Sequence, residues 1–252
     1  MEKKYNNYSL LKRPQAVLFD TDNTLYNYYP ANRAAEEAVC KKVENLLSIK
    51  KKDFFKIYEI AKNEVKESLK NTASSHSRLL YFQRMIELLG YKAQLLLALD
   101  FEQTFWRTFL ANAPLFPGIK ETLLFFKKKN IPIAVVTDLT SHIQLRKLTY
   151  FGLENTFDAV VTSEEVGIDK PNKKNFILAL KKLNLSSDSY FWMIGDNPET
   201  DIYGAKQFNS STFQKIHNKV LVGQENFSPD FVIRNYDEYL DKIQKFFNKI
   251  EK

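Results

Sequence analysis

Residues 15–24 read QAVLFDTDNT, an apolar run that stops at once in a cluster of aspartates, threonines and an asparagine. Pro14 precedes the run, and turn-forming residues follow it. A short apolar run with such boundaries is typical of a strand that is buried on both faces of a sheet. We therefore predict a buried strand over residues 15–19, which carries Asp20 and Asp22 into the loop at its end.

After residue 118 the chain alternates apolar runs with helical patterns. Further strands are predicted at 131–136, 159–161, 190–194, 212–216 and 231–233, and helices at 119–129, 141–150, 172–182 and 237–250. Strands that alternate with helices favour right-handed crossovers and a parallel sheet with helices on both faces. The sequence thus predicts an α/β fold with a Rossmann-like, doubly wound, mostly parallel sheet.

The stretch that follows the first predicted strand has a different character, with helical periodicity and no comparable strand signal. Roughly four helices fit there. Gly90 suits the C-terminal cap of the third helix, and Pro114, Pro117 and Gly118 close the stretch. We predict an all-helical module at residues 27–111, inserted into a core made of residues 1–26 and 112–252.

The composition is typical of a folded protein from a reducing compartment. The 252 residues are 44% hydrophobic, and 7 glycines and 8 prolines are too few for a collagen-like or low-complexity chain. The single cysteine, Cys40, offers no internal disulfide and forms no zinc pattern with the three histidines. No apolar run approaches the roughly 20 residues of a membrane span, and no apolar signal segment stands before Pro14. We therefore expect a cytoplasmic protein with no membrane partner.

The net charge of +7 comes from 37 basic and 30 acidic residues. The excess lies in short lysine runs, such as residues 50–52 and 127–129, which we interpret as solvated surface. Aromatic residues do not interleave with these charges as they do in nucleic-acid-binding stripes, so no nucleic-acid partner is expected. A positive field would still help to collect small anionic substrates.

Polar clusters follow two other predicted strands. Thr137 and Asp138 come after one apolar run, and Asp196, with Asp201 five residues later, comes after another. Because the carboxyl ends of parallel strands meet at one edge of a sheet, we expect these residues to converge with Asp20. Carboxylates that lie close together need a cation, and oxygen donors without His or Cys favour Mg²⁺.

Mg²⁺ held by a few carboxylates points to phosphoryl chemistry. Lys170, in the loop sequence GIDKP at 167–171, supplies a compact positive charge for a phosphoryl group. The chain has no GxxxxGK(S/T) loop, no GxGxxG after a strand and no GxSxG elbow. Nucleoside triphosphate hydrolysis, dinucleotide binding and serine hydrolase chemistry therefore lack their motifs.

In these motifs the chain resembles the haloacid dehalogenase superfamily of hydrolases, in the branch with a helical cap inserted after the first strand. The matching motifs are, in chain order, DTDNT at 20–24, Thr137, Lys170 and GDNPETD at 195–201. Each is weak alone, whereas four in order at predicted strand ends are specific. The resemblance covers nearly the whole chain and identifies the helical module as a cap domain.

The resemblance also implies roles for the motif residues. Asp20 would be the nucleophile that forms an aspartyl-phosphate, and Asp22 the general acid and then the base for water. Thr137 would bind the phosphoryl oxygens, and Lys170 would offset the charge of phosphate and nucleophile. The groups that would hold Mg²⁺ are Asp20, Asp196 and the backbone carbonyl of Asp22, with Asp201 as a supporting acid. Dehalogenases of the family lack the second aspartate and the metal, so Asp22 favours a phosphatase.

Asp138 departs from the family pattern, in which a small polar residue such as asparagine often follows the motif threonine. We include it with Thr137 and Lys170 among the residues of the predicted phosphate site, as a supporting acid. The alternative is an acid at the N-terminus of the helix that begins near Ser141, stabilised by the helix dipole.

In capped members of the family, the cap closes over the site and selects the substrate. The polar stretch NTASSHSR at 71–78 contains His76 and Arg78, which could grip a sugar phosphate, and Tyr26 could line the cleft. In the alternative reading, Ser74 or Ser75 only caps the next helix, Arg78 lies in solvent and Tyr26 packs at a hinge.

We predict a Mg²⁺-dependent phosphomonoester hydrolase that acts on a small phosphorylated metabolite through an aspartyl-phosphate, as a monomer or homodimer. A sugar phosphate is the favoured substrate, ahead of a nucleoside monophosphate or a phosphoglycolate-like acid. The alternatives are a 5′-nucleotidase or phosphotransferase on the same scaffold, and a non-catalytic binding protein that keeps the fold.

Overall fold

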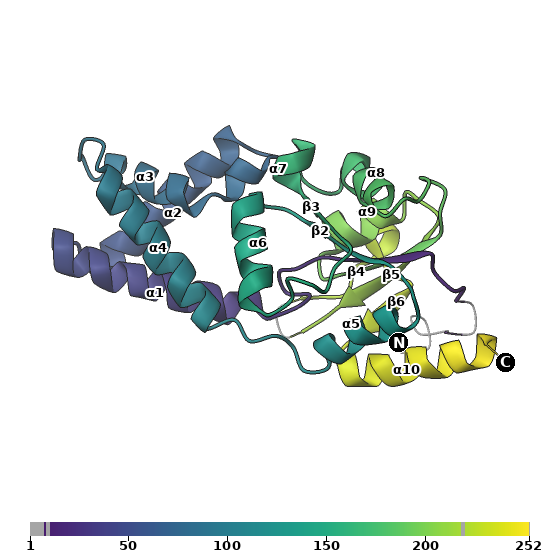
Figure 1. Ribbon diagram of the computed structural model, residues 1–252. Coiled ribbons are helices and arrows are strands. Elements are labelled where there is room, and N and C mark those ends of the chain that lie inside the picture. Colours follow the sequence, from purple (N-terminus) through teal and green to yellow (C-terminus); the bar gives the residue numbers. More distant parts are fainter. Residues whose placement is uncertain (1–7, 9–10, 218–219, 252) are drawn as a thin grey trace.

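The computed structural model describes residues 8, 11–217 and 220–251 (Figure 1). At its centre these residues form a parallel six-stranded sheet in the order β3-β2-β1-β4-β5-β6. The strands are β1 (Ala16–Phe19), β2 (Ile133–Thr137), β3 (Ala159–Thr162), β4 (Phe191–Gly195), β5 (Ser210–Lys215) and β6 (Phe231–Ile233). The strand order reverses between β1 and β4, which opens a crevice at the carboxyl ends of these two strands.

Strand β1 lies in the middle of the sheet, hydrogen-bonded to β2 on one side and β4 on the other. All four of its residues are buried. Val17 and Phe19 belong to one hydrophobic layer, and Ala16 and Leu18 to the layer on the opposite face. Burial on both faces is the reason that this continuous apolar run forms an interior strand.

Helices cover both faces of the sheet (Figure 1). On the face of Val17 and Phe19 lie α5 (Ile119–Lys128), α6 (Ser141–Tyr150) and α10 (Tyr236–Ile250). On the other face lie α7 (Ser163–Val166), α8 (Lys173–Lys182) and α9 (Tyr203–Ala205). Trp192 of β4 anchors the first layer, with its ring 6.0 Å from that of Phe126 and 6.1 Å from that of Phe247.

Four further helices form a separate bundle beside the sheet (Figure 1). They are α1 (Tyr28–Leu47), α2 (Lys51–Ser68), α3 (Arg78–Leu88) and α4 (Leu95–Ala111), with a short 3-10 helix, η3 (Ala73–His76), before α3. Their core is aromatic: the ring of Phe82 lies 6.0 Å from that of Phe101 and 6.1 Å from that of Phe105. This bundle core is continuous with the apolar layer on one face of the sheet.

Two chain segments join the bundle to the sheet, and they run side by side. The backbone N–H of Phe116 donates to the carbonyl of Leu25 at 2.9 Å, and Tyr26 and Leu115 form an isolated β-bridge. The predicted module boundaries, residues 27 and 111, fall beside this junction.

The predicted fold class is confirmed, since the sheet is parallel, flanked by helices on both faces and ordered as in Rossmann-type folds. Strand β6 and helix α6 have the predicted bounds, whereas β5 begins two residues before the expected start. The cap of α3 proposed in the alternative reading was wrong. Ser77, not Ser74 or Ser75, accepts the capping hydrogen bond from the N–H of Leu80, because η3 takes up the preceding residues.

Within the part of the chain that the structure describes, no helix combines the length and the apolar character needed to cross a membrane.

Candidate active site

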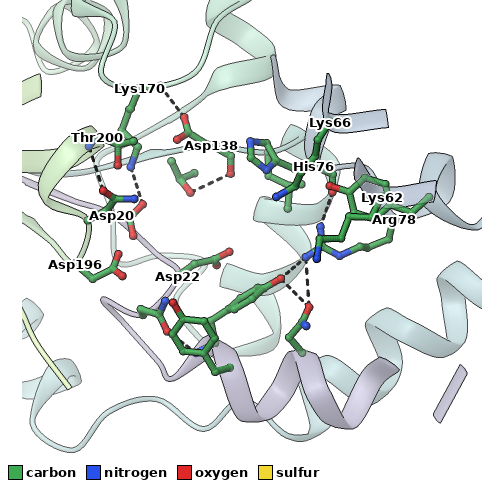
Figure 2. Close-up of a pocket in the computed structure, with 18 of the residues that line it drawn as sticks. Asp20, Asp22, Lys62, Lys66, His76, Arg78, Asp138, Lys170, Asp196 and Thr200 are labelled. Carbon is green, nitrogen blue, oxygen red and sulfur yellow. Dashed lines mark hydrogen bonds and ion pairs between the residues drawn. The ribbon is translucent and has the colours of Figure 1, made fainter. Parts of the chain in front are cut away.

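The structure brings together the polar clusters at the carboxyl ends of β1, β2 and β4 (Figure 2). Asp20 follows β1, Thr137 ends β2 and Asp196 follows β4. These residues line one side of a cavity of about 430 Å³, and residues of α1, α2 and α3 line the other side. The cavity lies where the strand order reverses, the usual ligand site of an open α/β sheet.

Lys170 is the centre of a buried charge network. Its ammonium group donates to Asp20 Oδ1 and Asp201 Oδ1, both at 2.7 Å, and to the carbonyl of Val136 at 2.9 Å. Burial by itself lowers the pKa of Lys170, but the neighbouring carboxylates outweigh burial and raise it, so the group is cationic. Lys170 is thus placed to balance negative charge that develops on or beside Asp20.

Three carboxylates form an acidic group around the same point. Single oxygens of Asp20, Asp196 and Asp201 all lie within 4.8 Å of one another. Burial raises the pKa of Asp20 to about 7, opposed by Lys170 and assisted by Asp201. Burial and the charge of Asp20 also raise the pKa of Asp196. A hard divalent cation among these oxygens would restore the ionised carboxylates, and the donor set therefore fits Mg²⁺.

The backbone at the end of β4 is shaped to admit Asp201. A Cβ atom at Gly195 would collide with the carboxylate of Asp201, so only glycine leaves room for this side chain. Asp201 Oδ1 accepts from Lys170, and Asp201 Oδ2 accepts from the backbone N–H of Asn197 at 3.1 Å. Asp201 is thereby fixed against both the strand end and Lys170, as a supporting acid would be.

Asp22 lies outside this acidic group and is held from another direction. Lys147 of α6 donates to both of its oxygens, at 2.8 and 3.2 Å, and the hydroxyl of Tyr26 donates to Oδ1. Burial alone would raise the pKa of Asp22, but Lys147 and then Tyr26 outweigh burial and lower it. The Asp22 side chain is therefore held as a carboxylate that faces the cavity.

Thr137 is held by side chains on two sides. Its hydroxyl lies 2.8 Å from that of Thr21 and accepts from Gln144 Nε2 at 2.8 Å. Since Gln144 already donates to it, the Thr137 hydroxyl can direct its own hydrogen to an acceptor: the carbonyl of Asp138, at 3.4 Å in the structure, the hydroxyl of Thr21, or a phosphoryl oxygen.

Asp138 does not lie in the first turn of α6, so the alternative of an acid at that helix N-terminus was wrong. Its Oδ1 accepts from the backbone N–H of Lys170 at 2.9 Å, and the N-terminal turn of α6 contains no acid. Burial raises the pKa of Asp138 to about 6. Through its hydrogen bond with Lys170, the side chain of Asp138 fixes the backbone of the Lys170 loop. Direct contact of Asp138 with phosphate stays a prediction.

The predicted specificity residues have three different placements. Arg78 does not lie in solvent, contrary to the alternative reading: it lines the cavity, and its guanidinium donates to the carbonyl of His76 at 2.6 Å. His76 also lines the cavity, but its ring contacts Asp169 of the core at 3.1 Å. Tyr26 is completely buried and reaches Asp22 instead of the cavity wall.

Sequence reasoning missed Gln144 and Lys147. Both are almost completely buried on α6, three residues apart and therefore on one side of the helix. The apolar residues Ile143 and Leu148 flank them on the buried side. Two long polar side chains within the buried stripe of a helix were the available signal, because such groups need partners in the interior.

The chain matches the haloacid dehalogenase-like hydrolase family over residues 14–209. A ribulose-1,5-bisphosphate 5-phosphatase of Halopiger xanaduensis is 39% identical over 198 residues, covering 78% of this chain and 82% of that protein. A glyceraldehyde 3-phosphate phosphatase of Methanopyrus kandleri is 28% identical over 234 residues, covering 92% and 97%.

Solved structures share the architecture. A phosphatase of the same family from Thermococcus onnurineus has a TM-score of 0.69 at 23% identity, covering 91% of this chain and 97% of its own. A 2-haloacid dehalogenase from Pseudomonas syringae has a TM-score of 0.71 at 22% identity, covering 93% and 100%. At these identities the structures show a common fold. The match to the family spans most of the chain and includes every residue of the crevice described above. The protein therefore belongs to the haloacid dehalogenase-like hydrolases.

Proposed function

We propose that the protein is a Mg²⁺-dependent phosphatase that hydrolyses a small sugar phosphate through a phosphorylated Asp20. The observation that carries the proposal is the placement of Asp20, buried between the cation of Lys170 and the carboxylates of Asp196 and Asp201. A carboxylate held in this way can attack phosphorus while its surroundings absorb the change in charge.

In the first step, an oxygen of Asp20 forms a bond to phosphorus and the ester bond to the sugar oxygen breaks. Asp22 enters this step protonated, because the negative charge of the bound phosphate opposes its ionisation, and it gives that proton to the departing oxygen. In the second step, Asp22 takes a proton from water, whose oxygen attacks the phosphorus and releases phosphate from Asp20. Lys147 and Tyr26 stabilise the carboxylate form of Asp22 that this second step requires.

The metal would be held by Asp20, Asp196 and the backbone carbonyl of Asp22, with Asp201 as a supporting acid. Bound Mg²⁺ supplies positive charge that neutralises the phosphoryl oxygens. Lys170 adds a fixed cation from the protein side, and Thr137 presents its hydroxyl to a phosphoryl oxygen. Asp138 holds the loop that carries Lys170.

The substrate class is supported by the relatives and by the cavity. The two relatives described above are named for sugar phosphates, and a cavity of about 430 Å³ has room for such a molecule. We propose that residues 27–111 act as a cap that supplies the far wall of this cavity. A cytoplasmic location suits the metabolite substrates.

The test compares wild type with Asp20→Asn, with and without Mg²⁺, on p-nitrophenyl phosphate and then on a panel of sugar phosphates and nucleoside monophosphates. We expect Asp20→Asn to lower kcat by about 10⁴-fold without loss of structure, because the nucleophile is removed. Asp53→Asn, at an exposed site on α2, is the matched control.

Circular dichroism checks that both variants are folded. Turnover that survives in Asp20→Asn, or that ignores Mg²⁺, would refute the mechanism. Preference for nucleotides over sugar phosphates would favour a nucleotidase, and transfer to an added alcohol or sugar in preference to water would favour a phosphotransferase.

A further inference from the structure

The two walls of the cavity differ in charge (Figure 2). The core wall carries the carboxylates Asp20, Asp22 and Asp196, which the proposed chemistry uses. The opposite wall, from the helical bundle, carries the cations of Lys62, Lys66 and Arg78, here called the basic cluster. Figure 2 places this cluster across the cavity from Asp20 and Asp196.

Lys62 and Lys66 stand four residues apart on α2, so both project from the same side of the helix. Lys62 contacts Glu59 at 2.8 Å, whereas none of the described residues gives Lys66 a carboxylate partner. Desolvation at the cavity wall lowers the pKa of Lys66, and the positive charges of Lys62 and Arg78 lower it further. The three cations therefore repel one another, and an anion between them would relieve that repulsion.

Arg78 is fixed in place without being neutralised. Its guanidinium donates to the carbonyl of His76 and the hydroxyl of Tyr28, and it lies 5.2 Å from the ring centre of Phe105 and 5.6 Å from that of Trp106. Among the described residues, no carboxylate forms an ion pair with it. An arginine oriented by carbonyl, hydroxyl and ring contacts keeps its charge for a ligand, and its geometry suits phosphate.

Glu36 is the acid that lines this side of the cavity. Its Oε1 accepts from Asn32 Nδ2 at 2.7 Å, and burial raises the pKa of Glu36. Even when both are ionised, Glu36 and Glu59 do not balance three cations. The bundle wall is thus positive, although the phosphoryl group that reacts is already provided for by Lys170 and the metal site on the core wall.

We propose that the basic cluster binds a second phosphate of the substrate, so that the enzyme prefers a small sugar bisphosphate to the corresponding monophosphate. This proposal rests on the proposed function, because it places the reacting phosphate at Asp20. The reacting phosphate then occupies the core wall, the sugar spans the cavity and the second phosphate contacts Lys62, Lys66 and Arg78. The same contacts would orient the sugar so that one of its two phosphates reaches Asp20.

The kinetic test uses Lys62→Gln/Lys66→Gln, because both lysines are on the helix surface and their replacement leaves the aromatic core intact. Substrates are matched pairs: ribulose 1,5-bisphosphate with ribulose 5-phosphate, and fructose 1,6-bisphosphate with fructose 6-phosphate. We expect wild type to favour at least one bisphosphate by about tenfold or more in kcat/KM, and the variant to lose about tenfold or more of that preference, mainly through KM. Lys56→Gln, an exposed site on the same helix, should keep the wild-type ratio.

A binding test separates this proposal from the proposed function. In the Asp20→Asn background, isothermal titration calorimetry with each bisphosphate and monophosphate measures affinity without turnover. We expect Lys62→Gln/Lys66→Gln to weaken bisphosphate binding about tenfold or more and monophosphate binding much less. If wild type hydrolyses esters through Asp20 but the substitutions weaken both ligands equally, or neither, the second-phosphate site is refuted and the phosphatase stands. Absence of all turnover would refute the phosphatase, while the calorimetry would still decide whether the basic cluster binds phosphate.

Discussion

Lys147 is a buried positive charge that connects α6 to Asp22, the proposed acid–base residue. Its ammonium group binds both oxygens of Asp22 and lies 5.3 Å from the ring centre of Trp106 and 5.4 Å from that of Phe109. The two aromatic rings come from α4 of the bundle, so a residue of the core is packed between Asp22 and the bundle. Burial lowers the pKa of Lys147, which makes the ion pair with Asp22 necessary for its charge.

Lys147→Met should therefore disturb Asp22 without touching the phosphate site. We expect kcat to fall by up to about 100-fold with little change in KM, because a misplaced acid–base group affects the chemical steps more than binding. Steady-state kinetics on p-nitrophenyl phosphate measure the effect. In an Asp22→Asn background the same substitution should cost less than about threefold. An equal loss in both backgrounds would mean that Lys147 acts on stability and not through Asp22.

At the scale of elements, the local pattern was sufficient for the sheet and insufficient for the site. Strands β1 and β4 are short apolar runs, so burial on both faces specified them and, with them, the convergence of Asp20 and Asp196. The partners of those groups depend on which helix packs where. Lys147 reaches Asp22 across 125 positions of sequence, a contact that no local pattern encodes.

Lys215, at the end of β5, gives an element-scale prediction about stability. It is 3% exposed and donates to the carbonyls of Ile216 and Arg234, and burial lowers its pKa to about 8. Between pH 8 and the ordinary lysine value, the unfolded chain holds a proton that the folded chain has lost, so the free energy of unfolding rises with pH in that window.

Relative to Lys215→Met, wild type should therefore gain about 2.5 kcal/mol in the free energy of unfolding between pH 7 and pH 10. Urea unfolding of both proteins at several pH values measures this difference, and the subtraction removes the groups that titrate in both. A difference that stays flat over the whole range would show that Lys215 keeps its ordinary pKa in the folded protein.

At the scale of the whole molecule, the bundle and the core meet directly at the loop that carries Lys170. The ring of His76 contacts Asp169 at 3.1 Å, and the N–H of Asp169 donates to the carbonyl of Asn71 at 3.0 Å. Asp169 immediately precedes Lys170, so the bundle contacts the loop that holds the cation beside Asp20. The sequence placed His76 in a polar stretch of the bundle, but its partner in the core depends on how the two parts dock.

His76→Ala should loosen this docking without removing any group from the core wall. We expect kcat/KM for a sugar phosphate to fall by about tenfold, chiefly through KM, because closure of the bundle over the substrate becomes less favourable. Hydrogen–deuterium exchange should rise both in residues 71–78 and in residues 166–172, since each side of the contact loses its partner. His142→Ala, at an exposed site on α6, should change neither quantity. Faster exchange confined to residues 71–78 would mean that His76 stabilises only its own segment and does not hold the loop that carries Lys170.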